Sequence, residues 1–181
     1  MEFKSIAVFC GSKSGNNKLF ASDTTTLGYL LTKKNILLIY GGGNKGMMGA
    51  IANAVLEKDG KVIGIIPELL LGWEQQHTGI SELIIVDDMH KRKRLMYEKC
   101  DAAIILPGGF GTLDELFEIL TWNQLSIHDK PIYLLNTAGF YDCLLRHVEK
   151  MVAENFLYNS IQNSFTVVTT PDQIFSATAQ R

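Results

Sequence analysis

The chain has 181 residues, of which 46% are hydrophobic and 20% charged, a balance typical of one globular domain spanning 1–181. Its formal charge of −2 argues against a general nucleic-acid or membrane-surface binder, so we expect a small-molecule partner, no nucleic acid and no membrane. Three cysteines without a CxxC pair, and an N-terminal apolar run too short for a signal peptide, favour the cytoplasm.

Short apolar runs rich in Ile, Val, Leu and Tyr alternate along the chain with longer helix-like stretches. The β-strands we predict are Ser5–Cys10, Ile36–Tyr40, Lys61–Ile66, Leu83–Val86, Ala102–Leu106, Pro131–Leu135 and Phe165–Val168. Runs that are apolar throughout indicate burial on both faces, which is typical of a doubly wound, mostly parallel α/β sheet, here of about seven strands flanked by helices. In such a Rossmann-like fold, ligands bind at the carboxyl ends of the strands.

Three predicted strands end in glycine-containing turns, which we expect to meet in one crevice: Cys10–Ser12, Gly41–Gly43 and Gly108–Gly111. Ser12 and Lys13 are candidates to contact a phosphate there. The second cluster, GGGNKGMMG, has the G-x-G-x-x-G spacing of dinucleotide-binding proteins, but no acid clearly closes the next strand and no GK[ST] follows. A mononucleotide or phosphosugar site fits this cluster better, and a role only in packing is the alternative.

The segment 67–82 gives neither a clean strand nor a long helix, and we interpret it as a loop over the crevice. Leu69–Leu71 and Trp73 in this loop would be costly to expose on a monomer, so packing against a second subunit is the alternative.

The basic run HKRKR at 90–94 resembles a solvated surface, but helical geometry separates its members. At 100° per residue, Arg92 shares a face with Met89 and Met96, whereas Lys91 lies roughly opposite. We therefore predict that Arg92 points inward, where an unpaired charge would cost several kcal/mol. Its partner is either a structural carboxylate or the anion of a substrate.

The stretch Pro107–Glu115, PGGFGTLDE, joins a glycine turn, a helix start and a carboxylate directly behind a predicted buried strand. The N–H groups of such a turn can hold a phosphate at the helix start, which we place at Thr112. Glu115 then has two interpretations. It completes a capping box with Thr112, or its carboxylate faces the crevice near Arg92.

Other chemistries have little support in the sequence. The four histidines, His77, His90, His128 and His147, have no metal-ligand spacing among themselves or with the cysteines, so we predict no metal site. No G-x-S-x-G elbow marks a nucleophilic serine, and Cys10 at a strand end is expected to be a small buried residue.

Four motifs, CGSKSG, GGGNKGMMG, MHKRKRLM and PGGFGTLDE, together resemble the LONELY GUY (LOG) family of cytokinin riboside 5′-monophosphate phosphoribohydrolases. The most specific elements, M-H-x-R-K and P-G-G-x-G-T-x-x-E, occur here at 89–93 and 107–115. The resemblance implies hydrolysis of the N-glycosidic bond of a purine nucleoside 5′-monophosphate, either a cytokinin riboside monophosphate or AMP, to free base and ribose 5-phosphate. It implies no cofactor, and nothing in the chain indicates the pyridoxal phosphate chemistry of the label "lysine decarboxylase" that such proteins often carry.

The resemblance also implies residue roles, with Arg92 and Glu115 as the catalytic pair. Together with the glycine turns, it makes the following candidates for substrate binding: Glu74, Arg92, Lys93, Gly108, Gly109, Phe110, Gly111, Thr112, Leu113, Asp114, Glu115, Thr121, Ser12, Gly42 and Gly43. Members of this length typically form homodimers, so a neighbouring chain could add to the pocket.

Two alternatives remain at this point. An apolar slot, lined by Met89, Met96 or Trp73, would favour a cytokinin precursor over AMP. A non-catalytic carrier of nucleotides or phosphorylated ligands could share the fold, although a carboxylate beside a bound phosphate weakens simple retention.

Overall fold

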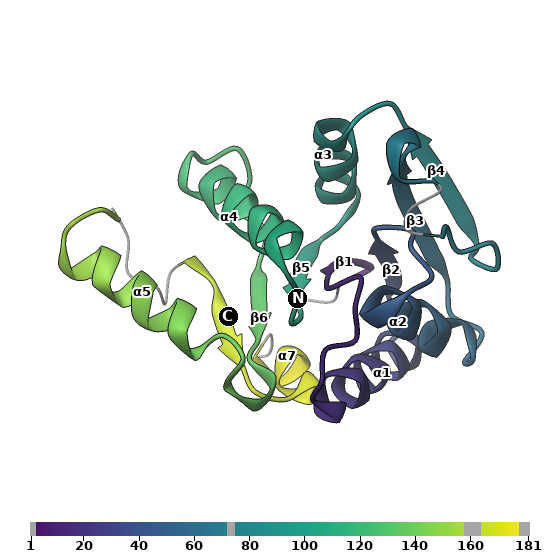
Figure 1. The fold of residues 1–181 in the computed structure, drawn as a ribbon, viewed down its shortest axis with the longest axis horizontal. Coiled ribbons are helices and arrows are strands. Elements are labelled where there is room, and N and C mark those ends of the chain that lie inside the picture. The colour runs from purple at the N-terminus through teal and green to yellow at the C-terminus, as the bar shows by residue number, and fades with distance from the viewer. Residues whose placement is uncertain (1–2, 72–74, 158–163, 178–181) are drawn as a thin grey trace.

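The computed structural model describes residues 3–71, 75–157 and 164–177 (Figure 1). The strands are β1 (Ser5–Phe9), β2 (Leu37–Tyr40), β3 (Val62–Pro67), β4 (Glu82–Val86), β5 (Ala102–Ile105), β6 (Ile132–Leu135) and β7 (Thr166–Val168). The α-helices are α1 (Lys18–Lys33), α2 (Gly46–Leu56), α3 (Met89–Lys99), α4 (Phe110–Gln124), α5 (Asp142–Ala153) and α7 (Pro171–Ala177). Two short 3-10 helices, η1 (Glu68–Leu70) and η2 (Thr137–Gly139), follow β3 and β6.

All seven strands pair in parallel in one sheet of order β4-β3-β2-β1-β5-β6-β7. This confirms the predicted α/β fold, and each strand lies within one residue of its predicted bounds. The central strands β1 and β5 are buried along their whole length, whereas the edge strand β4 exposes part of its surface. Burial on both faces explains why the central strands are apolar throughout.

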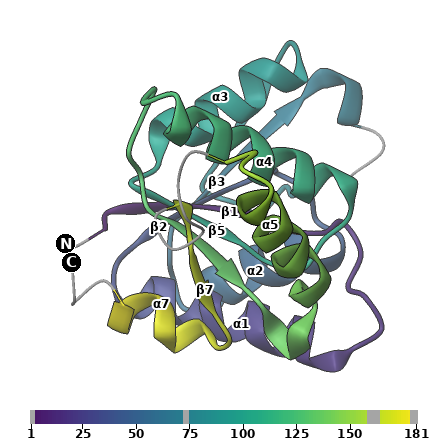
Figure 2. The same ribbon diagram turned by 90° about the vertical axis from the view of Figure 1, so that its left-hand side faces the viewer.

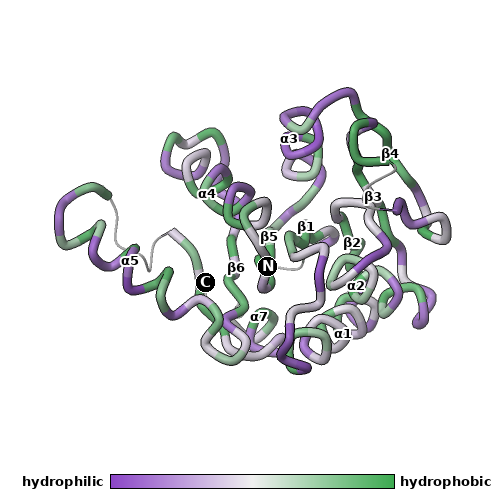
Figure 3. The backbone as a smooth tube through the Cα atoms, in the orientation of Figure 1, coloured by the Kyte–Doolittle hydropathy of each residue, from purple (hydrophilic) through white to green (hydrophobic). Residues whose placement is uncertain are grey.

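Helices cover both faces of the sheet (Figures 1 and 2). Alternate residues of β1 belong to the hydrophobic cores on opposite faces of the sheet. Ile6 and Val8 pack in the core formed with α1, α2 and α7. Ala7 and Phe9 pack in the core formed with α3 and α4. Figure 3 shows the hydrophobic strands at the centre and hydrophilic stretches along the outer helices. Within the described ranges, no helix is both long and apolar enough to cross a membrane.

The winding of the chain reverses between β1 and β5. From β1 the chain steps outward through β2 and β3 to β4, and it then returns to the other side of β1 as β5. The turns after these two strands lie in contact, because the amide of Gly11 donates a hydrogen bond to the carbonyl of Pro107 over 3.1 Å. The topology therefore brings the first and third predicted glycine turns together at the point where open α/β sheets bind ligands.

Candidate active site

A pocket lies at the carboxyl ends of β1 and β5, between α3 and the start of α4. Its lining includes the following predicted site residues: Ser12, Arg92, Gly109, Phe110, Gly111, Thr112, Asp114 and Glu115. On its apolar side are Cys10, Met48, Leu70 and Met89. Segments distant in the sequence thus supply one cavity of about 260 Å³.

Arg92 points into this pocket from α3, as its helical position predicts. Only 6% of the residue is exposed, and its Nε donates a hydrogen bond to the carbonyl of Ile65 over 3.1 Å. Its Nη2 lies 4.0 Å from Oε1 of Glu115, which is the long end of the range for an ion pair. The carbonyl at the end of β3 thus orients the guanidinium while its outer nitrogens face the pocket.

Glu115 lines the pocket, and Thr112 is not the N-cap that the capping-box interpretation requires. Helix α4 begins at Phe110, with Gly109 as its N-cap, and the amide of Leu113 donates the first helical bond to the Gly109 carbonyl. Because the extended backbone of Gly109 already turns the chain into the helix, Thr112 is an internal helical residue. Glu115 therefore lies in the second turn, 7% exposed, and faces Arg92.

The start of α4 is suited to an anion. Three N–H groups, those of Phe110, Gly111 and Thr112, precede the first helical donor and have no acceptor within the helix. No side chain of the described residues caps this end, and all three residues line the pocket. The partial positive charge of the helix start therefore faces the cavity.

The glycines of the PGGFG turn have two different reasons to be glycine. A Cβ on Gly108 would lie 2.1 Å from Oγ1 of Thr112, so packing excludes a side chain there. A Cβ on Gly109 or on Gly111 would meet no atom within 4 Å, and neither residue has a positive φ. The fold does not require these two glycines, but a ligand that approaches the helix start closely would.

Lys93 occupies a different position from the nucleotide contact that the resemblance implies. It is 8% exposed, and its Nζ lies 3.1 Å from Asp114 and 2.9 Å from Glu118, both on α4. Burial alone lowers the pKa of the Lys93 ammonium, but the hydrogen bonds and charges of Glu118 and Asp114 outweigh it, so the net pKa is raised. Lys93 is therefore protonated, and it is absent from the pocket lining.

The second glycine turn also lies outside this pocket. Gly42 accepts a hydrogen bond from the amide of His77, and Gly43 forms an isolated antiparallel bridge with Gln76. Neither Gly42 nor Gly43 lines this pocket, because both glycines hold the 75–77 segment. Their neighbour Gly41 has a role that the sequence did not single out, since a Cβ there would lie 2.1 Å from Nη2 of Arg92.

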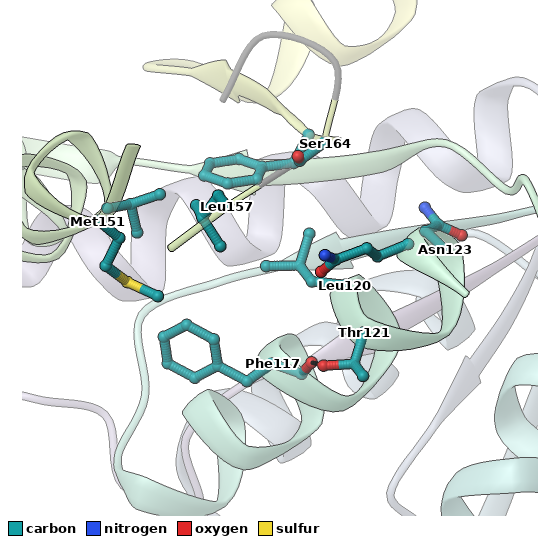
Figure 4. Close-up of a pocket in the computed structure, with 10 residues that line it drawn as sticks. Phe117, Leu120, Thr121, Asn123, Met151, Leu157 and Ser164 are labelled. Atoms are coloured by element: carbon teal, nitrogen blue, oxygen red, sulfur yellow. Dashed lines mark hydrogen bonds between the residues drawn. The ribbon is translucent and has the colours of Figure 1, made fainter. Parts of the chain in front are cut away.

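Three further described candidates, Leu113, Thr121 and Gly108, are absent from the lining of this pocket. Leu113 packs against the core between the sheet, α3 and α4. Thr121 donates a hydrogen bond to the carbonyl of Phe117 and lines a separate pocket between α4 and α5 (Figure 4). Gly108 lines an adjoining pocket, and Glu74 lies outside the described residues.

That adjoining pocket continues the crevice on the other side of the β1 turn. It shares Gly11, Ser12 and Gly109 with the first pocket and adds Lys13 from the turn. Ser12 and Lys13, both exposed, are therefore positioned near the helix start where the anion is expected. The two pockets form one crevice around the PGG turn.

The apolar side of the first pocket differs from the predicted slot. Met89 lines it, but Met96 is fully buried in the core, and Trp73 lies outside the described residues. Met48 and Leu70 take their place. Leu70 follows β3 in η1, so the described part of the 67–82 segment contacts the crevice as predicted.

The sheet is all-parallel and doubly wound, and a pocket lies at its switch point beside the start of α4. This arrangement defines a Rossmann-like α/β protein with a candidate anion-binding site. The model of the family described as "Possible lysine decarboxylase" matches residues 48–178. The chain belongs to this family, and specifically to the LONELY GUY proteins that its motifs resemble.

Relatives with this name are similar over most of their length. One from Arabidopsis thaliana, named "Probable cytokinin riboside 5'-monophosphate phosphoribohydrolase LOG6", is 44% identical over 173 residues, covering 96% of this chain and 86% of the relative. "Cytokinin riboside 5'-monophosphate phosphoribohydrolase LOG1" from the same plant is 47% identical over 156 residues. The match covers 86% of this chain and 73% of the relative.

Solved structures with the same fold are more distant in sequence. A molybdenum cofactor binding protein from Rippkaea orientalis has a TM-score of 0.73 at 22% identity, covering 99% of this chain and 98% of its own. A Moco carrier protein from Chlamydomonas reinhardtii has a TM-score of 0.72 at 18% identity. The match covers 97% of this chain and 95% of the carrier protein. These similarities establish the fold alone.

The family description mentions a lysine decarboxylase, but the site does not fit pyridoxal phosphate. A lysine that forms a Schiff base needs a lowered pKa. Among the described lysines, Lys93 is the buried one, and its carboxylate partners Asp114 and Glu118 raise its pKa.

Proposed function

We propose that the protein hydrolyses the N-glycosidic bond of a purine nucleoside 5′-monophosphate, releasing the free base and ribose 5-phosphate. The observation that carries this proposal is the buried pair of Arg92 and Glu115 in a pocket whose rim is the uncapped start of α4. Relatives more than 40% identical over most of the chain have names that state this activity for a cytokinin riboside 5′-monophosphate.

The helix start holds the 5′-phosphate in this proposal. The free N–H groups of Phe110, Gly111 and Thr112 donate to phosphate oxygens, and the helix dipole adds to the attraction. Glu115 lies five residues beyond Phe110 in α4, which is about 7.5 Å along the helix axis at 1.5 Å per residue. A ribose anchored by its phosphate is thereby directed with its C1′ toward Glu115, which removes most of the orientational freedom from the reaction.

Glu115 then acts on the charge that develops at C1′. As the base departs, the sugar takes on oxocarbenium character, and a carboxylate beside it stabilises that positive charge electrostatically. The same carboxylate can accept a proton from the attacking water, whose oxygen bonds to C1′. The guanidinium of Arg92 lies 4.0 Å from the Glu115 carboxylate and is held in place by the carbonyl of Ile65.

The substrate base is a cytokinin base, adenine or both. The apolar side chains of Met48, Leu70 and Met89 on one side of the pocket support a substrate with an apolar N6 group. The experiment is to incubate the protein with AMP and with isopentenyl-AMP, and to measure the free base and ribose 5-phosphate released from each. Faster release from isopentenyl-AMP is the expected result, and equal rates would indicate a general purine monophosphate nucleosidase.

The same assay separates an enzyme from a carrier. Calorimetry can measure the binding of AMP, and chromatography of the same mixture can detect adenine. Binding without either product would favour a non-catalytic carrier and would contradict the proposed hydrolysis.

We further propose a cytoplasmic homodimer. Cys100 is a buried thiol outside any disulfide, as suits a reducing compartment. Leu69 and Phe110 expose 76% and 93% of their surface beside the pocket, which supports contact with a second copy. Sedimentation equilibrium of the wild type should give twice the mass of one chain, whereas a monomer at micromolar concentration would contradict the assembly.

A further inference from the structure

Lys93 bridges α3 and α4 through two carboxylates that flank Glu115 in the sequence. Its side chain is 9% exposed, and its Nζ contacts Asp114 Oδ2 at 3.1 Å and Glu118 Oε2 at 2.9 Å. Asp114 and Glu118 are four residues apart and so lie on one face of α4. The ammonium group is thus held by two successive turns of the neighbouring helix.

Three ion-pair contacts, one from Arg92 and two from Lys93, therefore lie side by side between the same helices. Arg92 and Lys93 are adjacent on α3, and Asp114 and Glu115 are adjacent on α4. The Arg92–Glu115 contact is 4.0 Å long, and both of its residues line the pocket. Both Lys93 contacts are about 1 Å shorter. Asp114 lines the pocket, whereas Lys93 and Glu118 are absent from the lining. The shorter contacts restrain the helix spacing more strongly.

The burial of Lys93 strengthens this restraint. A buried ammonium that loses its partners costs several kcal/mol, so the side chain stabilises the arrangement in which α4 presents both carboxylates. An exposed pair on the same helix gives a comparison. Arg94 and Glu98 are 2.7 Å apart, but they are 75% and 55% exposed, and pairs of this kind contribute little.

We propose that Lys93 is a positioning residue that holds α3 against α4, so that Arg92 and Glu115 face the same ligand, and that Lys93 does not itself contact the nucleotide. This inference rests on the proposed function. It replaces the direct nucleotide contact that the family resemblance implies for Lys93 with an indirect role through Asp114 and Glu118.

The test compares Lys93→Met with the wild type in AMP affinity, kcat and thermal stability. We expect the dissociation constant of AMP to stay within about threefold, because Lys93 is outside the pocket, and kcat per folded molecule to fall at least about tenfold. Arg94→Met is the matched control, since it breaks an exposed pair on the same helix and should leave all three quantities unchanged. Glu118→Gln keeps the contact between Lys93 and Asp114, so its kcat should fall less than that of Lys93→Met. If Lys93→Met does not fold, Glu118→Gln is measured in its place.

Rescue provides the readout that a purely structural role would not give. Reversal of the pair, Lys93→Glu with Glu118→Lys, should recover kcat several-fold over Lys93→Glu alone. Weaker AMP binding by Lys93→Met would overturn the inference in favour of direct contact, and an unchanged kcat with a lower melting temperature would overturn it in favour of stability alone. A wild type without turnover would overturn the proposed function and this inference with it, whereas the other two outcomes leave the function standing.

Discussion

Gly41 and Arg92 fit together so closely that the glycine has no room for a side chain. A Cβ on Gly41 would lie 2.1 Å from Nη2 of Arg92 and 3.1 Å from Sδ of Met48. The guanidinium thus occupies the space that a side chain at the end of β2 would fill. The glycine cluster after this strand contributes to the site by admitting Arg92.

Gly41→Ala is therefore expected to displace Arg92 without unfolding the protein. The clashing atoms are the ends of flexible side chains, so they can move at small cost, and the φ of Gly41 is not positive. We expect kcat/KM to fall at least about tenfold, with a melting temperature within a few degrees of the wild type. Gly79→Ala, at an exposed glycine outside the pocket, is the control. Wild-type activity in Gly41→Ala would contradict the role of Arg92.

Gly109→Ala and Gly111→Ala should separate ligand binding from folding. Neither new Cβ would meet an atom within 4 Å, and alanine at position 111 gains up to about 1 kcal/mol of helix propensity. We therefore expect unfolding free energies equal to or above the wild type, together with at least a tenfold rise in KM.

Gly108→Ala provides the contrast in the same turn. Its Cβ would meet Oγ1 of Thr112 at 2.1 Å, so this variant should lower the melting temperature. An unchanged KM in both Gly109→Ala and Gly111→Ala would show that no ligand group approaches the start of α4.

Glu115→Gln tests the catalytic carboxylate directly. Because Glu115 lies in the second turn of α4, the variant removes a negative charge from the pocket and leaves the helix start intact. We expect kcat to fall by about 10²–10³-fold. The melting temperature should change little, because glutamine keeps the size of the side chain and Arg92 keeps its hydrogen bond to the carbonyl of Ile65. Glu98→Gln, at an exposed position on α3, is the control, and comparable turnover in Glu115→Gln would refute the catalytic assignment.

The sequence predicted the parts of this protein that depend on local pattern. Each strand lies within one residue of its predicted bounds, and the central strands β1 and β5 are almost entirely apolar because both of their faces are buried. The inward direction of Arg92 followed from the helical period alone, and the structure confirms it.

Features that depend on packing between distant segments were not predictable in this way. The helix start was misplaced because Thr112 has the chemistry of an N-cap, whereas the extended backbone of Gly109 makes the turn earlier. The partners of Lys93 lie 21 and 25 residues away on another helix, and the fit between Gly41 and Arg92 joins β2 to α3. The sequence pattern indicates which face of a helix is buried, but only the folded structure shows which residues that face contacts.

His128 predicts how stability depends on pH. Its ring packs against Tyr97, with centroids 4.0 Å apart, and both ring nitrogens are buried without a hydrogen-bond partner among the described residues. Burial, aided by the charge of Lys130, lowers the pKa of His128 from 6.5 to about 4. Between these values the unfolded chain binds a proton that the folded protein does not, so stability is full above about pH 6.5 and is lost as the pH falls toward 4.

His128→Phe should make this loss shallower, because phenylalanine fills the aromatic site and does not titrate. We expect urea unfolding to show a smaller difference in unfolding free energy between pH 7 and pH 5 for the variant than for the wild type. Some slope should remain, since burial also lowers the pKa of His77. His147→Phe, at an exposed position on α5, should keep the wild-type slope. An equal slope in His128→Phe and the wild type would mean that the folded protein binds the proton at His128 as readily as the unfolded chain.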